Sequence, residues 1–246
     1  MSKKLFILSA LSVILLISLL ISLSVGSVSV SFAEMLNIFS DGNETNRRIL
    51  LDIRLPRVLN AMLVGASLSC SGIILQSMLR NNLAEPGLLG ISAGAGLGAI
   101  LIFILPVSVP FMFITPVSFL FAVTTTGIIF YFSKGFGSKY FNSISTNRII
   151  LTGIAISALI SSVNGFLLLI SGSSVNQILY WLNGGFSGRG WNEFSVGIIF
   201  VVIGLVGSVL ISKDLNVMNL GDELSVSLGL NLKRFQKVSV ILSSLL

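Results

Sequence analysis

The feature that most constrains the fold is a series of apolar runs, each about 20 residues long and separated by short polar segments. About 20 helical residues cross ~30 Å of hydrocarbon, so these runs predict membrane-spanning helices. The expected spans are 5–25, 59–79, 87–106, 111–133, 149–171 and 193–212. A seventh run begins near Val238 and comprises nine residues up to and including Leu246, too few to cross a bilayer. We therefore expect an all-α, polytopic membrane helix bundle with six complete spans and an incomplete seventh, in the amino-terminal portion of a longer protein, and treat 1–246 as one transmembrane domain.

Composition supports lipid as the solvent of this chain. Of the 246 residues, 54% are hydrophobic and only 10% are charged, and the mean hydropathy is +1.00. A soluble protein needs more charged groups to cover its surface, so an ordinary soluble globule is excluded. The chain has no histidine, the commonest general base and metal ligand. We therefore expect neither an enzyme nor a metal site, and no cofactor.

The amino terminus has two readings, because Lys3 and Lys4 precede an apolar run as they would in a signal peptide. We interpret the run as a retained span, since it reaches about Val25 without a small-residue cleavage site at the usual distance. With a cytoplasmic N-terminus, the inner loops hold ten basic and four acidic residues, and the outer loops hold five of each. The positive-inside rule supports this orientation in a bacterial inner membrane. The basic excess therefore reflects topology and does not indicate nucleic-acid binding.

The source of energy is also constrained by charge. The spans from residue 59 onward have no charged residue in their interiors, so they offer no side chain of the kind that relays protons. The chain also lacks the phosphate-binding pattern G-x-x-x-x-G-K-[ST]. If transport is ATP-driven, the ATPase must therefore be a separate subunit.

Two local patterns fall between residues 54 and 98. Arg54 and Arg57 lie in the first outer loop, where the positive-inside rule disfavours arginine. Gly90, Gly94 and Gly98 recur every four residues, which favours close packing of a neighbouring helix on that face.

Several motifs in combination resemble the FecCD-type permeases of type II ABC importers, which transport iron-siderophores, haem or vitamin B12. They are R-L-P-R at 54–57, Q-x-x-x-R-N-x-L-A-x-P-G-x-L-G-I-x-x-G-A at 76–95, S-T-N-R at 145–148, L-T-G-I-A at 151–155 and Y-W-L-N-G-G-F at 180–186. The resemblance implies ten helices per subunit and a homo- or heterodimer of permease subunits in the membrane lipid. It also implies two cytoplasmic ATPase subunits and an extracytoplasmic substrate-binding protein.

The resemblance also implies roles for individual residues. Arg54 and Arg57 would dock the binding protein through its carboxylates, although local pairing with Asp52 or Glu44, or anchoring at the lipid headgroups, is an alternative. A segment similar to G-E-x-x-A-x-x-L-G would couple to the ATPase as two short helices separated near residue 229, with serine in place of the usual alanine. Its residues are Gly221, Asp222, Glu223, Ser225, Leu228 and Gly229.

The translocation pathway is expected along the span 149–171 and the loop before it. Thr146 and Asn147 match the gate positions of the family, and Leu83 is a weaker third candidate. The polar residues expected to line the pathway are Thr152, Ser157, Ser161 and Asn164. Hydroxyl groups in a membrane helix also commonly bond to backbone carbonyls, so simple packing is the alternative.

Two other functions stay open on sequence grounds. A secondary transporter could bind sodium through backbone carbonyls and hydroxyls, without a charged side chain in the membrane. A non-functional, truncated membrane scaffold would also show the same apolar runs.

Overall fold

The structure, a computed structural model, describes residues 3–26, 28, 44–105, 107, 109–133 and 146–246. Every regular element in these residues is a helix, which confirms the expected all-α class. The chain forms two compact units, Met1–Gly65 with Phe186–Ile199 and Ala66–Gly185 with Phe200–Leu246. Helices α4 (Leu55–Leu79) and α9 (Trp191–Leu210) each contribute residues to both units.

The first unit contains α1 (Lys3–Ser24), α3 (Glu44–Arg48), the π-helix η1 (Ile49–Arg54) and the first parts of α4 and α9. Within α1 no residue is buried, and its surface is mostly apolar from Leu5 onward. Two hydrogen bonds hold the start of α9. The Trp191 indole donates to the Leu51 carbonyl at 3.0 Å, and the Asn60 amide donates to the Gly190 carbonyl at 3.1 Å.

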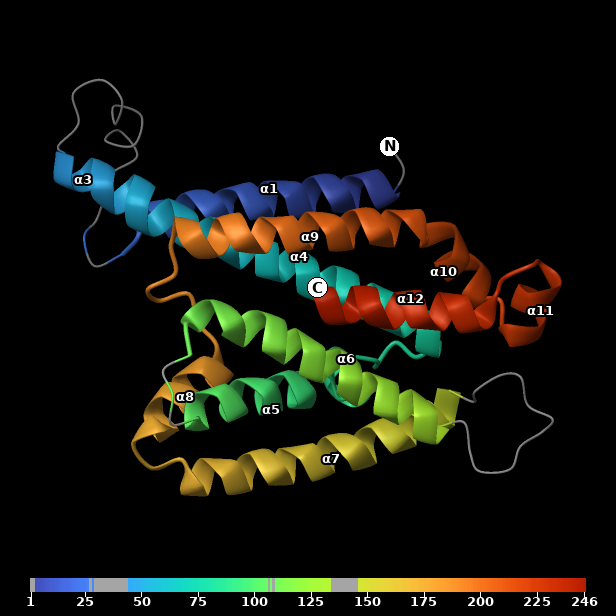
Figure 1. The fold of residues 1–246 in the computed structure, drawn as a ribbon. Coiled ribbons are helices and arrows are strands. Elements are labelled where there is room, and N and C mark those ends of the chain that lie inside the picture. Colours follow the sequence, from blue (N-terminus) through green and yellow to red (C-terminus); the bar gives the residue numbers. More distant parts are fainter. Residues whose placement is uncertain (1–2, 27, 29–43, 106, 108, 134–145) are drawn as a thin grey trace. The chain divides into compact units, whose positions relative to one another are not determined.

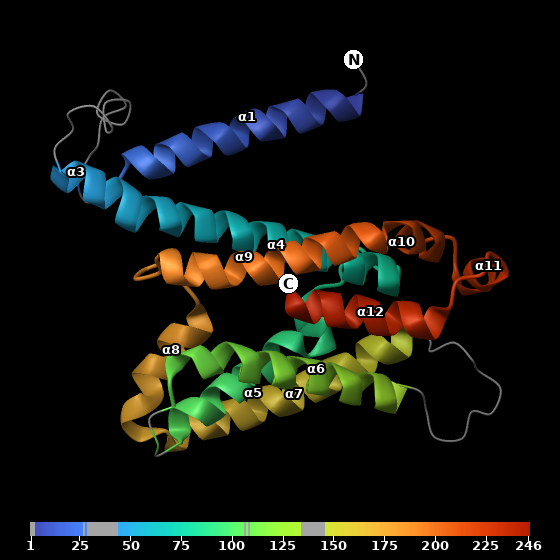
Figure 2. The ribbon, with the colours of Figure 1, turned by 45° about the horizontal axis from the view of Figure 1, so that its top comes forward.

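The second unit contains most of the helices, and Figures 1 and 2 label its α-helices. After α4 they are η2 (Pro86–Leu89), α5 (Ile91–Ile104), η3 (Phe111–Phe113), α6 (Ile114–Ser133), α7 (Thr146–Ile170), η4 (Gly172–Ser174) and α8 (Val175–Asn183). After the second part of α9 come α10 (Ser212–Met218), α11 (Asp222–Ser227) and α12 (Leu232–Leu245). Helix α5 lies against both α6 and α7, and α12 also packs against α6.

The core of the second unit joins segments that are far apart in the sequence. Leu79 of α4, Ile129 of α6 and Ile149 of α7 are at most 2% exposed and belong to one apolar cluster. Met218 and Phe235 bring α10 and α12 into the same cluster. This packing fixes the end of the unit that carries the short helices α10 and α11.

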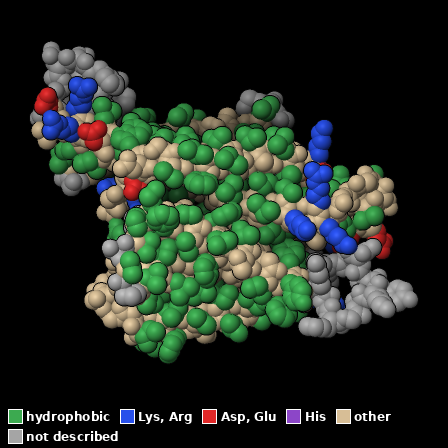
Figure 3. All heavy atoms as spheres, in the orientation of Figure 1, with side chains coloured by type: hydrophobic (Ala, Val, Ile, Leu, Met, Phe, Trp, Pro, Cys, Tyr) green, Lys and Arg blue, Asp and Glu red, His purple; other side chains and the backbone are tan. Residues whose placement is uncertain are grey.

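Among the residues that the structure describes, five helices are long and apolar enough to cross a membrane. They are Lys3–Ser24, Glu44–Leu79, Ile114–Ser133, Asn147–Ile170 and Trp191–Leu210. They coincide with five of the six expected spans, and hydrophobic side chains cover much of the helix surface in the space-filling view (Figure 3). The other expected span, 87–106, is shorter than predicted. Its helix α5 has 14 residues, about 21 Å at 1.5 Å per residue.

The backbone explains why α5 starts late. Pro86 begins a 3-10 turn, and Gly90 then adopts a left-handed conformation with φ of 69°. A regular α-helix cannot pass through a residue with positive φ, so α5 begins only at Ile91. The last helix, α12, begins earlier in the sequence than predicted. Instead of starting near Val238, α12 begins at Leu232, where the Asn231 side chain accepts a hydrogen bond from the Arg234 amide at 3.1 Å.

Candidate functional site

Helix α11 is a short, separately braced element between α10 and α12. Gly221 precedes it with φ of 106°, and Gly229 follows it with φ of 88°. The Leu230 amide donates to the Ser225 carbonyl and the Gly229 amide to the Val226 carbonyl, both at 2.9 Å. These bonds close the helix in a Schellman motif with glycine at the left-handed position. Two glycines with positive φ therefore set the limits of a six-residue helix.

Ser225 fastens α11 to α10. Its side chain is fully buried, and its hydroxyl lies 2.9 Å from the Val217 carbonyl of α10 and 2.6 Å from the Gly221 carbonyl. A hydroxyl has one proton, so it donates to one of these carbonyls at a time. A larger side chain would not fit this buried position. The serine that replaces alanine in the expected motif thus adds a polar tie between the two short helices.

The outer surface of this segment is apolar. Leu220, Leu224, Val226 and Leu228 are each more than half exposed. The Glu223 side chain is exposed beside them. An exposed apolar patch on a rigid short helix is typical of a protein interaction site. Of the expected coupling residues, Ser225 is buried, while Leu228 and Glu223 are accessible.

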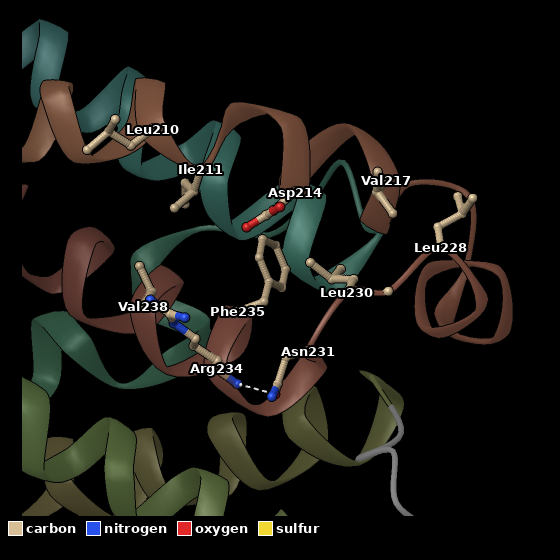
Figure 4. A pocket seen from close by; sticks show the side chains of 11 residues that line it. Leu210, Ile211, Asp214, Val217, Leu228, Leu230, Asn231, Arg234, Phe235 and Val238 are labelled. Carbon is tan, nitrogen blue, oxygen red and sulfur yellow. Dashed lines mark hydrogen bonds between the residues drawn. The ribbon is translucent and has the colours of Figure 1, made fainter.

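A hollow of about 520 Å³ lies behind the turn that follows α11 (Figure 4). Its walls come from the end of α9, from α10, from the turn at 228–231 and from the start of α12. Asp214 and Arg234 place opposite charges on these walls, and the ring of Phe235 lies between the helices. Lys and Arg side chains gather around this region in Figure 3. Sequence reasoning missed the hollow, since it is formed by the fold around the turn at Gly229.

The two arginines of R-L-P-R differ sharply in their surroundings, both within the first unit. Arg54 is buried, with 7% of its surface exposed. Its guanidinium donates to the carbonyls of Leu23 at 2.6 Å and Ser24 at 2.9 Å, and also to the carbonyl of Val28. Arg57, one helical turn later, is exposed. Docking of the binding protein by Arg54 and Arg57 stays a prediction, with Arg57 accessible and Arg54 bonded to main-chain carbonyls in this structure.

The position of Arg54 has a physical explanation. The last carbonyls of a helix have no partners within it and carry partial negative charge, so a cation near them is stabilised. Arg54 meets the last carbonyls of α1 in this way. Gly26 makes room for it, because a Cβ there would lie 2.6 Å from the Arg54 Nη2 atom. The local carboxylate pairing considered from the sequence is replaced by main-chain capping.

The glycine row lies at the contact between α5 and α6. A Cβ on Gly94 would lie 2.8 Å from the Phe121 carbonyl oxygen and would also collide with the Thr125 hydroxyl. A Cβ on Gly98 would lie 3.1 Å from the Val117 carbonyl oxygen. Gly90 lies just before the helix and faces Thr125 and α7. These glycines let the two backbones approach more closely than any side chain would allow.

The polar side chains of α7 divide into two groups. Ser157 donates to the Gly87 carbonyl and Asn164 to the Ala93 carbonyl, each at 3.2 Å. Ser161 is exposed, and Thr152 is half-buried. The oxygen of the Asn164 amide is buried and has no partner among the described residues. Two of the four expected pathway residues thus tie α7 to η2 and α5.

The expected gate residues lie at the start of α7 and in the loop after α4. Asn147 is exposed and lines a hollow of about 330 Å³ together with Asn81 and Arg80. Leu83 has 83% of its surface exposed. The side chain of Thr146 lies outside the described residues. The structure thus brings Asn147 close to the loop that carries Leu83.

Sequence reasoning placed Arg80 in an inner loop and in the motif at 76–95, but gave it no role of its own. Its guanidinium Nη2 lies 2.8 Å from the Asp222 carboxylate oxygen Oδ1, 142 residues along the chain. The sequence offered one signal, a basic residue directly after the last apolar turn of a span. That signal does not indicate that Arg80 pairs with Asp222.

Comparison with known proteins gives the family. Residues 14–246 match the FecCD transport family. The hemin transport system permease protein HmuU of Yersinia pestis is 35% identical over 96% of this chain and 70% of its own length. The vitamin B12 import system permease protein BtuC of Yersinia enterocolitica is 32% identical over 97% of this chain and 68% of its own length.

A solved structure agrees with these relatives. It is an inward-facing conformation of a metal-chelate type ABC transporter, with a TM-score of 0.79 and 28% identity. The match covers 97% of this chain and 72% of that chain. Permease relatives and five apolar helices indicate a multi-pass membrane protein. Because the family match extends over nearly the whole sequence, the resemblance seen in the motifs is confirmed, and the chain belongs to the FecCD transport family.

Proposed function

We propose that this chain is the permease subunit of an ATP-driven importer for a metal chelate or corrinoid, such as an iron-siderophore, haem or cobalamin. The relatives named for hemin and vitamin B12 support this substrate class. The observation that carries the ATP-driven mechanism is α11, a braced helix with an accessible apolar surface. Such a helix can be pushed as a rigid body by a partner that closes around it.

The arrangement proposed for the whole assembly follows from this role. One domain over 1–246 would contain six spans, counting α5, and the start of a seventh, with the N-terminus in the cytoplasm of a bacterial inner membrane. Two permease subunits would surround the pathway, two cytoplasmic ATPases would contact α11, and an extracytoplasmic binding protein would deliver the substrate. Hydrolysis of ATP would occur on the ATPase subunits. Ten helices per subunit are expected from the family.

Residue roles follow from accessibility. Arg57 is the proposed contact for the binding protein, and Arg54 positions it by fixing the end of α1. The residues proposed to line the pathway are Thr152, Ser157, Ser161 and Asn164, and those proposed for the gate are Thr146, Asn147 and Leu83. A guanidinium suits docking because it stays charged and can donate two parallel hydrogen bonds to one carboxylate.

The contact with the ATPase is tested by placing a charge on the apolar patch. We expect Leu224→Asp to reduce association with the ATPase at least about thirtyfold, since truncating a central apolar contact commonly costs ~2 kcal/mol or more. Co-purification of the permease with its ATPase measures the loss. The control is Asn216→Asp, which adds the same charge at an exposed position of α10. Equal association of the Leu224→Asp variant and the wild type would contradict a role for α11 in ATPase contact.

The turn at Gly229 provides a second test of the coupling segment. A Cβ on this residue would meet nothing within 4 Å, so its substitution is limited by φ of 88° and not by space. We expect Gly229→Ala to destabilise the turn by about 1 kcal/mol and to lower transport per ATP hydrolysed. Gly229→Asn should lose less, because asparagine tolerates left-handed backbone. If transport per ATP instead falls further in Gly229→Asn than in Gly229→Ala, side-chain size and not backbone conformation limits this position.

A further inference from the structure

The ion pair between Arg80 and Asp222 joins two elements that no helix or loop connects directly. Arg80 lies at the end of α4, and Asp222 is the first residue of α11. Their closest atoms are 2.8 Å apart, and the two side chains are 36% and 25% exposed. An ion pair this accessible adds little to stability. Because the pair links the end of α4 to the first residue of α11, it can transmit movement between these two helices.

The backbone on both sides is shaped to allow this pair. Arg80 has φ of 47°, the only left-handed residue other than glycine among the described residues. The Asn81 amide donates to the Gln76 carbonyl at 3.1 Å, which gives the α4 terminus a pattern that usually places glycine where Arg80 lies. Arginine at this position costs free energy that glycine would not. The guanidinium of Arg80 lies against α11 in this conformation.

Gly221 completes the fit on the other side. A Cβ on this residue would lie 3.3 Å from the Arg80 Nη1 atom, and its own φ of 106° is unfavourable for a side chain. The guanidinium can therefore lie close to the backbone that begins α11. Two unusual backbone conformations, 141 positions apart, converge on one ion pair.

The chain after Arg80 leads through a short loop into η2, which lies in hydrogen-bonding distance of the membrane helices. The Leu83 amide donates to the Asn81 side chain at 2.9 Å, which shapes the loop directly after Arg80. In the η2 turn that follows, the Gly87 carbonyl accepts from Ser157 of α7 at 3.2 Å. The Thr126 hydroxyl of α6 lies 3.3 Å from the Leu89 carbonyl and 2.8 Å from the Ala122 carbonyl of its own helix, and it donates to one of them at a time. A displacement of Arg80 can thus reach both α6 and α7.

We propose that the pair of Arg80 and Asp222 is a latch that carries movement of α11 to the end of α4 and to the loop that follows it. This inference rests on the proposed function, since α11 moves only if an ATPase acts on it. The buried Ser225 hydroxyl holds α11 rigid from behind, and the latch connects its front end to the membrane helices. Arg80 and Asp222 are positioning residues and need not touch the substrate.

The latch is tested by charge exchange in proteoliposomes that contain the permease, its ATPase and its binding protein. We expect Arg80→Asp and Asp222→Arg each to lower substrate transported per ATP about fivefold or more, the lower end of typical coupling between sites. The double exchange restores the opposite charges and should recover most of the ratio. Arg80→Gly removes the pair but relieves the backbone, so it should fold at least as well as the wild type and still lose coupling.

The control is Lys237→Asp, which changes the same charge at an exposed position of α12 and should leave the ratio unchanged. Single variants with the wild-type ratio, or a double exchange no better than its parents, would overturn the latch while leaving the importer intact. A wild-type complex that takes up substrate without ATP would overturn the proposed function itself, and the latch with it. The two failures are therefore distinguishable.

Discussion

Gly94→Ile should prevent the present packing of α5 against α6 and should strongly destabilise the second unit. A Cβ on Gly94 would lie 2.8 Å from the backbone oxygen of Phe121, and a backbone oxygen cannot rotate away as a side chain can. The helices would have to separate. We expect a loss of about 3 kcal/mol, at the upper end of typical overpacking costs. Thermal unfolding of the detergent-purified protein measures it.

A matched control for this prediction lies on α6. Gly127 is exposed, and a Cβ there would meet nothing within 4 Å. Gly127→Ile introduces the same side chain into an apolar helix of the same unit, so it should leave the unfolding temperature close to that of the wild type. Equal unfolding temperatures for the two variants would show that close approach at Gly94 does not hold α5 to α6.

The two arginines of the first unit should respond in opposite ways to substitution. Arg57→Glu should lower the affinity for the loaded binding protein about tenfold at low salt, because a docking charge mainly governs electrostatic attraction. Its unfolding temperature should not change, since the side chain is exposed. Arg54→Met should instead destabilise the protein by about 2 kcal/mol, because charge-assisted hydrogen bonds to the end of α1 are lost.

Binding and unfolding must both be measured on both variants. Surface plasmon resonance of the purified permease with its binding protein gives the affinity, and thermal unfolding gives the stability. A salt titration adds a check, since the effect of Arg57→Glu should shrink as the Debye length falls. If Arg54→Met weakens docking without loss of stability, the capping role is wrong and both arginines face the partner.

The helices were largely predictable because lipid imposes a simple rule on sequence. Apolar runs such as 5–25 and 111–133 had to be helical to satisfy their backbone groups. The start of α5 could not be predicted in this way, because hydropathy depends on side-chain type and not on backbone conformation. Gly90 has a left-handed φ and lies in close contact with α6 and α7, and an apolar run in the sequence indicates neither feature.

The candidate site was predictable in location but not in its internal contacts. The motif at 221–229 identified the segment that forms α11, and its two limiting glycines were visible in the sequence. The burial of Arg54 was not, since the R-L-P-R motif carries no information about the carbonyls at the end of α1. The partner of Arg80 was equally hidden, because no periodic pattern links residues 142 apart.

The most direct test of the account is uptake into proteoliposomes that contain the permease, its ATPase and its binding protein. We expect the loaded binding protein to stimulate ATP hydrolysis, and labelled chelate to accumulate only when ATP is supplied. Accumulation driven by a sodium or proton gradient, with no ATP on either side, would contradict it.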